Sequence, residues 1–169
     1  MLGDMFSRLK RQRPDSPEDC LELGLAYHKT GQLAKAIKAY LSALELRPNF
    51  VTAYQHLGAA YDEIGQFVDA LKAYAKAIML APQDPELRND LGLVYFSVGS
   101  YAEAIKAFKQ ALEIDSHNAR AHYSLGLVYL DLGDLDLALA QHCELNNRNE
   151  KQLAFQLLDK IQLQSRQAS

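Results

Sequence analysis

A 34-residue period constrains the fold of this chain more than any other feature of its sequence. Two series of four glycines recur at this interval and include every glycine of the chain except Gly3. Single columns of leucine, tyrosine and alanine repeat at the same interval without an exception. The glycine series are Gly24, Gly58, Gly92 and Gly126, and Gly31, Gly65, Gly99 and Gly133. A fixed period of this length predicts a repeat protein, in which each unit packs mainly against its neighbours along the chain.

Each unit has the pattern of two helices joined by a glycine turn. In the second unit, apolar residues recur at helical spacing between Phe50 and Ile64, and again between Phe67 and Ile78. Gly65 lies between the two stretches, and glycine ends a helix readily because it adopts the left-handed conformation at little cost. The residues that we expect to cap the first helices of the four units are Ser16, Asn49, Asp84 and Asn118.

A second glycine lies inside each expected first helix, where glycine costs about 1 kcal/mol relative to alanine. We expect this cost to be offset by close approach of the second helix, through a small residue such as Ala36 against Gly24. The large rings of the columns that begin with Tyr27 and Tyr40 are expected to fill the space between neighbouring hairpins.

The order of the columns resembles the tetratricopeptide repeat: Leu-Gly, a tyrosine three residues on, a turn glycine, an alanine, an aromatic residue, an alanine and a final proline. The resemblance covers four units over residues 17–152. It implies an all-α fold, a right-handed superhelical solenoid of antiparallel helix pairs. The fourth unit departs from the pattern, since His142 replaces the aromatic residue and Leu145 an alanine, as is typical of a terminal repeat.

Residues 150–164 have the pattern of one further amphipathic helix, which we interpret as a capping helix. Its apolar face consists of Leu153, Ala154, Leu157, Leu158 and Ile161. The expected organisation is a flexible basic segment at 1–16, repeats at 17–50, 51–84, 85–118 and 119–149, the capping helix at 150–164 and a tail at 165–169.

The composition and the cysteines indicate where the protein works. A net charge of −3 and a pI of about 5.9 argue against nucleic acid, which is usually held by a basic surface. Cys20 and Cys143 form no Cys-x-x-Cys pair, and a reducing compartment accounts for them most simply. No apolar run approaches the length of a membrane span, and the N-terminus lacks the apolar stretch of a secretory signal. We therefore expect a cytoplasmic protein with no transmembrane segment and no bound nucleic acid.

The sequence shows no pattern of catalytic, metal-ligating or cofactor-binding residues. His142 and Cys143 are adjacent, so their side chains diverge by about 100° on a helix. His117 and His122 are not at ligand spacing either. The chain has no Gly-Lys-Ser or Gly-Lys-Thr phosphate loop. We expect no enzymatic activity, no metal ion and no cofactor.

The resemblance implies that the first helices line the concave side of the solenoid. We number the motif positions of each unit from Pro17, Val51, Pro85 and Ala119. Positions 2, 5, 9 and 12 lie on the helix face turned away from the second helix. Position 9 is apolar in all four units. Exposed apolar surface of this kind usually marks a binding site. We predict a groove that holds a peptide or amphipathic helix of a partner protein by apolar anchors, with hydrogen bonds from Gln55, His56 and Asn89. The predicted groove residues are Leu21, Leu25, His28, Gln55, His56, Ala59, Asn89, Leu93, Phe96, Arg120, Tyr123, Leu127 and Leu130.

An alternative is that the capping helix or a neighbouring repeat covers part of this apolar line. Some family members bind a C-terminal carboxylate in a different site, the carboxylate clamp. The clamp needs Lys and Asn in one unit, Asn in the next unit, and Lys and Arg in the third. The resemblance places Leu21 and Leu25, then His56, then Glu86 and Asp90 there. We therefore do not expect the chain to grip a C-terminal carboxylate.

A second functional hypothesis concerns residues 1–13, which carry a net charge of +3. Apolar residues beside the basic ones share a helix-like face, formed by Met1, Leu2, Met5, Phe6 and Leu9. Such a segment can insert into a neighbour's groove in a self-assembling scaffold, or touch an anionic membrane weakly as part of a peripheral assembly factor. The remaining alternative is an unstructured tail with neither role.

Overall fold

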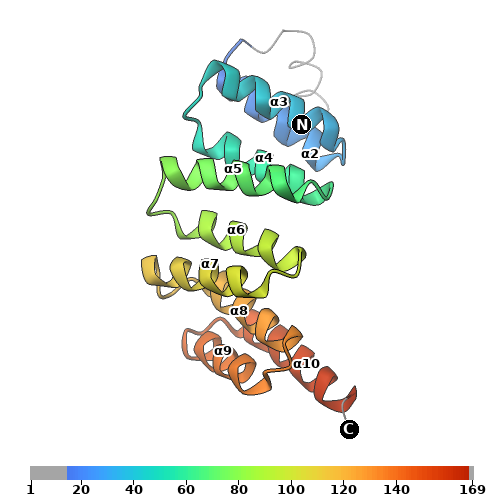
Figure 1. The fold of residues 1–169 in the computed structure, drawn as a ribbon, viewed down its shortest axis with the longest axis vertical. Coiled ribbons are helices and arrows are strands. Elements are labelled where there is room, and N and C mark those ends of the chain that lie inside the picture. Colours follow the sequence, from blue (N-terminus) through green and yellow to red (C-terminus); the bar gives the residue numbers. More distant parts are fainter. Residues whose placement is uncertain (1–14, 168–169) are drawn as a thin grey trace. The chain divides into compact units, whose positions relative to one another are not determined.

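The computed structural model describes residues 15–167, and within this range it contains nine helices and no strand (Figure 1). The chain divides into two compact units, each larger than one repeat. Unit 1 ends at Pro82 and unit 2 begins at Gln83, and from here on the 34-residue segments are called repeats. Each unit is built from pairs of antiparallel helices. The segment 1–14, to which the hypotheses of self-assembly and membrane contact apply, lies outside the described residues, as do residues 168 and 169.

Unit 1 contains the first two helix pairs. Its helices are α2 (Pro17–Lys29), α3 (Leu33–Leu46), α4 (Val51–Glu63) and α5 (Phe67–Leu80). The second helix of one repeat covers the first helix of the next, since α3 packs against both α2 and α4. Tyr40 and Ala43 of α3 are fully buried in this core together with Ala53 of α4. Burial of a large apolar side chain contributes roughly 1.5–3 kcal/mol, so this shared core holds the two repeats together.

Unit 2 contains two further helix pairs and one additional helix. Its helices are α6 (Pro85–Ser97), α7 (Tyr101–Ile114), α8 (Ala119–Asp131), α9 (Leu135–Asn147) and α10 (Lys151–Gln167). Here α7 packs against both α6 and α8, which repeats the arrangement of unit 1. α10 packs against α8 and α9 and contributes Leu157 and Ile161 to the core. It continues to Gln167, so the start of the predicted tail at 165 is helical.

The turn glycines and three of the four predicted caps of the first helices follow local sequence signals. The four turn glycines have φ between +71° and +79°, a left-handed conformation that most side chains disfavour. Ser16, Asp84 and Asn118 accept hydrogen bonds from N–H groups of the first turn, as predicted. The prediction for Asn49 is wrong, because the extended backbone at Phe50 makes Phe50 the N-cap of α4, without a side-chain hydrogen bond.

The glycines inside the first helices of repeats 1–3 make room for aromatic rings. A Cβ atom added to Gly92 would lie 2.6 Å from the ring of Phe108, and the other two glycines are in the same position. The pairs are Gly24 with Tyr40, Gly58 with Tyr74, and Gly92 with Phe108. The prediction that a small residue such as Ala36 approaches Gly24 is therefore wrong. The glycine admits the large ring of the second helix.

Repeat 4 fills the same space from a different helix. His142 stands where repeats 1–3 have the aromatic residue, and its Nδ1–H donates to the Ala154 carbonyl at 2.9 Å. A Cβ atom on Gly126 would collide with the side chain of Leu157 in α10. Leu157 is fully buried. The additional helix therefore completes the core of repeat 4.

Candidate functional site

The predicted groove residues of unit 1 lie on α2 and α4, which contact each other. Leu25 is 37 % exposed, and Leu21, Gln55 and Ala59 are half-buried. The fully buried positions of α4 are other residues, namely Ala53, Leu57, Gly58 and Ala60. The four groove side chains thus keep part of their surface available to a partner.

A hydrogen-bonded group orients His28 in unit 1. Its Nε2 lies 2.8 Å from Glu63 Oε1, and its Nδ1 lies 3.2 Å from the hydroxyl oxygen of Tyr40. A carboxylate only accepts, so in the neutral imidazole Nε2–H donates to Glu63 and Nδ1 accepts from Tyr40. Burial and, second, the Glu63 carboxylate raise the pKa of Tyr40 to about 12, so the hydroxyl keeps its proton at neutral pH. The ring of His56 stacks on Tyr40 at a centroid distance of 5.8 Å.

Asp62 adds a second carboxylate next to this group. Its Oδ1 atom is buried and has no hydrogen-bond partner within the described part of the chain. Burial and, second, the Glu63 carboxylate raise the pKa of Asp62. Leaving this acceptor without a partner costs free energy, which fits the raised pKa of the group. The sequence places Asp62 at motif position 12 but offers no reason to select it, because its burial depends on the folded neighbours.

The predicted groove residues of unit 2 form a more apolar group on α6 and α8, which also contact each other. Leu93, Phe96, Tyr123 and Leu127 are half-buried and pack against the core of the unit. The ring of Phe96 lies 6.0 Å from that of Tyr101 on α7, which fixes it near the turn. Unit 2 therefore presents larger apolar side chains than unit 1.

Two predicted groove residues of unit 2 are not available to a partner. Leu130 is only 6 % exposed and belongs to one core cluster with Leu157 and Ile161 of α10. Gln164 Nε2 donates to the Leu130 carbonyl at 2.9 Å, so α10 covers this end of the apolar line. Asn89 is fully buried, and neither polar atom of its amide has a partner in the described structure. Direct contact of these two side chains with a bound peptide is therefore a wrong prediction for this conformation.

Arg120 is exposed, and carboxylates of its own unit bind it. Its guanidinium donates to Glu86 and to Asp90 Oδ1, the second at 3.1 Å. Asn118 Nδ2 donates to Glu86 Oε1 at 2.6 Å. One guanidinium faces two carboxylates, so this cluster favours a neutral or cationic group of a partner over a carboxylate.

A family model described as TPR repeat matches residues 24–65, 63–99 and 92–133. The matches cover more than half of the 169 residues. The chain belongs to the tetratricopeptide repeat (TPR) family. The predicted family and the predicted all-α helical repeat fold are therefore confirmed. A TPR scaffold is typical of protein–protein interaction and is usually non-catalytic.

Solved structures of TPR proteins resemble this chain over most of its length. The crystal structure of MamA is 29 % identical, with a TM-score of 0.75, and the match covers 89 % of this chain and 88 % of MamA. MamA 41-end from Desulfovibrio magneticus RS-1 is 25 % identical, with a TM-score of 0.79 and coverage of 89 % and 87 %. TTC0263, a thermophilic TPR protein in Thermus thermophilus, is 25 % identical, with a TM-score of 0.79 and coverage of 95 % and 88 %. No curated protein sequence matches the chain.

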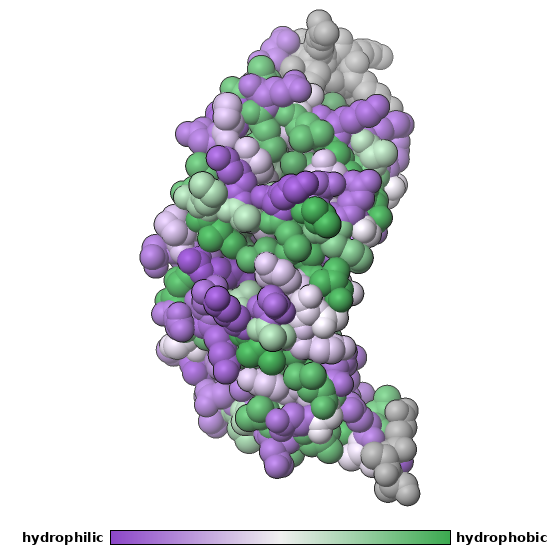
Figure 2. Space-filling model, viewed as in Figure 1, coloured by the Kyte–Doolittle hydropathy of each residue, from purple (hydrophilic) through white to green (hydrophobic). Residues whose placement is uncertain are grey.

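The described residues of this TPR protein do not form a metal-ligating set, since among residues 15–167 no three His, Cys, Asp or Glu side chains converge to hold an ion. Cys20 is buried and Cys143 is exposed, and both are free thiols. No helix in the same range is both long and apolar enough to cross a membrane. On the face shown in Figure 2, hydrophilic and hydrophobic side chains are interspersed.

Proposed function

We propose that this TPR protein is a non-catalytic module that binds a peptide or an amphipathic helix of a partner protein. Binding takes place on the accessible sides of the first helices of each unit, which we call the first-helix surfaces. They consist of Leu21, Leu25, Gln55 and Ala59 in unit 1, and of Leu93, Phe96, Tyr123 and Leu127 in unit 2. The observation that carries the proposal is that these side chains, all apolar except Gln55, stay partly accessible although the helix pairs are closed by other residues.

The partial burial of these side chains limits the affinity of the first-helix surfaces. Burying a leucine or phenylalanine completely contributes roughly 1.5–3 kcal/mol, and Leu93, Phe96 and Leu127 are already half-buried. Three or four such anchors, less the cost of association, correspond to a dissociation constant in about the micromolar range. Such an affinity fits a reversible interaction.

The polar neighbours of both surfaces favour a partner with cationic or N–H donor groups beside its apolar anchors. In unit 1, the carboxylate of Glu63, which binds His28, is exposed to solvent. In unit 2, two carboxylates face the one guanidinium of Arg120. A basic side chain of the partner would meet favourable charge in either unit, and a free carboxylate would not.

Affinity capture from the source organism's lysate tests this function. The double variant Leu93→Glu, Leu127→Glu places two negative charges on the first-helix surface of unit 2. The single variant Leu25→Glu places one negative charge on that of unit 1, where the native side chain is more exposed than Leu93 or Leu127. We expect the wild type to retain a protein that the variants lose. A matched control is Val68→Glu, whose side chain is 66 % exposed on a second helix.

Each variant is first checked for native far-UV circular dichroism and a cooperative thermal transition, because Leu93 and Leu127 contact the core. Loss of the captured protein with the surface variants and its retention by Val68→Glu support the proposal. Equal retention by all folded variants would place the function on another part of the protein.

A further inference from the structure

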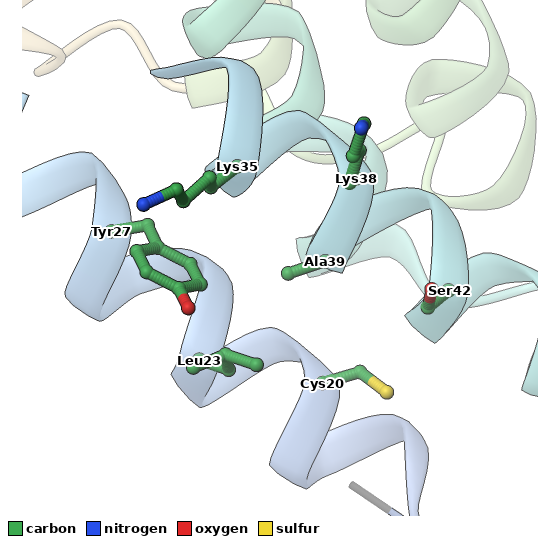
Figure 3. Close-up of a pocket in the computed structure, with 7 residues that line it drawn as sticks. All are labelled: Cys20, Leu23, Tyr27, Lys35, Lys38, Ala39 and Ser42. Carbon is green, nitrogen blue, oxygen red and sulfur yellow. The ribbon is translucent and has the colours of Figure 1, made fainter. Parts of the chain in front are cut away.

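A pocket of about 280 Å³ lies between α2 and α3 of repeat 1 (Figure 3). α2 lines it with Cys20, Leu23 and Tyr27, which stand at motif positions 4, 7 and 11. In α4 the residues at these positions pack in one core cluster with residues of α3, the helix that precedes α4 in the chain. Cys20 and Tyr27 belong to this cluster as well, and Cys20 is only 2 % exposed. This side of α2 therefore has the residues of a face that a preceding second helix covers.

The chain before α2 follows the 34-residue register of the repeats. Pro48 and Pro82 stand two residues after the last residues of α3 and α5, and Pro14 stands 34 residues before Pro48. The second helices of repeats 1–3 share one column of large rings, each beside a first-helix glycine. Phe6 stands 34 residues before the first member of this column, which consists of Tyr40, Tyr74 and Phe108. Pro14 and Phe6 therefore predict that a second helix precedes α2.

The apolar residues of this segment match the buried positions of α3. Subtracting 34 from the last residue of α3 places the end of the expected helix at residue 12. Leu2, Met5, Phe6 and Leu9 stand at the positions of four α3 residues that are at most 7 % exposed. Those four residues are Ala36, Ala39, Tyr40 and Ala43. Residues 1–12 thus carry an apolar face in the register of α3.

Opposite charges stand on the two sides of this expected contact. Near the start of α2, Asp15 and Asp19 stand where α4 has uncharged residues. Burial and, after it, the carboxylates of Asp19, Asp15 and Glu45 raise the pKa of the Cys20 thiol, since these acids lie close to this face. At the end of the expected helix, Lys10 stands where α3 has a buried leucine. In an antiparallel pair the end of one helix lies beside the start of the next, so Lys10 is placed to meet these carboxylates.

The charges at the other end of α2 fit the same arrangement. The Nζ of Lys35 lies 5.5 Å from the centroid of the Tyr27 ring, near the end of α2, and Lys38 also lines the pocket. The only acidic residue of segment 1–13 is Asp4, near its start, which antiparallel packing places toward this end of α2. The basic end of the segment thus meets the acids of α2, and its acid lies toward the lysines of α3.

We propose that residues 1–12 form a helix that packs on α2 of the same chain, as α3 packs on α4. The chain can reach its own α2, because residues 13–16 match in length residues 47–50, which join α3 to α4. The segment then completes the core of repeat 1 from its N-terminal side, as α10 completes that of repeat 4. Its basic residues are held on the protein's own surface, where they serve neither a membrane nor the groove of a second copy. This role goes beyond the partner binding proposed above and does not depend on it.

Chemical labelling of Cys20 tests the proposal on the full-length chain. Cys143→Ser removes the exposed thiol and leaves Cys20, on the face that residues 1–12 would cover, as the reporter. A buried thiol reacts only when its cover opens, so the labelling rate measures how readily the segment leaves α2. We expect Phe6→Asp to raise this rate at least about tenfold, because a charge replaces a buried ring. Met1→Asp, at the position of the exposed Lys35, is the matched control and should leave the rate unchanged.

A charge exchange tests the direction of the segment. The pair Asp15→Lys, Asp19→Lys and the pair Lys10→Glu, Arg11→Glu are each expected to speed labelling. The fourfold variant should label more slowly than the product of the two separate effects predicts, because opposite charges meet again. This double-mutant cycle cancels the direct effect of the new lysines on the thiol. Independent effects would mean that the end of the segment does not lie beside the start of α2, and would overturn the proposed packing.

The concentration dependence of labelling separates the chain's own segment from that of another copy. We expect the same rate at low and high protein concentration, with the mass of a single chain in light scattering. Labelling that slows as the concentration rises, with a larger mass, would assign the covering segment to a second copy and overturn the proposal. Equal rates in Phe6→Asp and Met1→Asp, with native circular dichroism in both, would overturn it as well.

Discussion

Repeats 1–3 and repeat 4 fill the same space with side chains from different helices. In repeat 3, Gly92 faces the ring of Phe108, which comes from the second helix of the same repeat. In repeat 4, Gly126 faces Leu157, which comes from α10. The glycine is kept where the aromatic residue is lost, because the first helix still needs room for a large side chain. This comparison teaches that α10 is part of the core of repeat 4 rather than a cover laid over a finished repeat.

The first and last repeats also differ in what covers their outer faces. In unit 2, α10 packs against α8 and α9 and takes Leu130 into the core. In unit 1, α2 and α3 of the first repeat line a pocket of about 280 Å³, whose residues Cys20 and Ala39 are buried. The last repeat is therefore completed by a helix that follows it in the chain, whereas the first repeat keeps a pocket between its own two helices.

The largest effect on this comparison is expected from Leu157→Ala. Leu157 is fully buried, and removing a buried leucine side chain costs about 2–5 kcal/mol when the surroundings cannot close the cavity. Urea denaturation followed by circular dichroism measures the loss. Leu163→Ala on the same helix is the matched control, since Leu163 is 57 % exposed and its loss should change stability by less than about 0.5 kcal/mol. Similar effects of the two variants would show that α10 does not complete the core.

A smaller effect, but a sharper one, is expected from alanine at two equivalent glycines. In Gly92→Ala the new Cβ meets the rigid ring of Phe108 at 2.6 Å, and the resulting strain exceeds the gain in helix propensity by about 1–2 kcal/mol. In Gly126→Ala the new Cβ meets the end of the flexible Leu157 side chain, which can turn away. We therefore expect Gly126→Ala to be less destabilising than Gly92→Ala. The opposite order in urea denaturation would contradict this explanation of the glycine column.

Restoring the aromatic residue in repeat 4 is expected to cost about 1 kcal/mol. His142→Phe removes the hydrogen bond to the Ala154 carbonyl and brings a ring toward space that Leu157 already occupies. In the double variant with Leu157→Ala the ring can enter the vacated space, so the two changes should cost less together than the sum of the single changes. A double-mutant cycle measures this coupling, and additive costs would mean that the two side chains do not compete.

The smallest expected effect concerns Asp62 in unit 1. Its pKa in the folded protein is raised from the usual 3.8, so the fold favours the protonated form and stability falls as pH rises above that value. Asp62→Asn removes this titration and should stabilise the protein at pH 7 by less than about 1 kcal/mol, because solvent screens a half-exposed group. The gain should disappear in melts below about pH 4, under the usual carboxyl pKa. A gain that is equal at both pH values would assign the effect to packing instead.

The repeat architecture could be predicted from the sequence because it is encoded locally. Turn glycines such as Gly65 report a backbone conformation, and caps such as Ser16 report a helix start. The 34-residue period then predicts that the second helix of a repeat packs on the first helix of the next, as α3 does on α4 and α7 does on α8. These signals do not depend on knowing which side chains meet across the fold.

The parts that could not be predicted depend on contacts between distant segments. Leu130 fits the apolar line of the sequence pattern, but α10 buries it. The size of the residue opposite Gly24 depends on the angle between α2 and α3, which the spacing does not give. Asn89 and Asp62 show their unusual environments only after folding, because burial removes the water that would otherwise satisfy their polar atoms.

Site-specific photocrosslinking tests the central claim, that the first-helix surfaces bind a partner, most directly. A photoreactive phenylalanine analogue is placed at Leu25 on α2 or, as a control, at Met79 on α5, where the native side chains are 37 % and 74 % exposed. Both proteins are irradiated in lysate of the source organism, and covalent adducts are read by their shift in gel mobility. We predict a discrete adduct from position 25 and none from position 79. An adduct from position 79 alone would contradict the assignment of partner binding to the first helices.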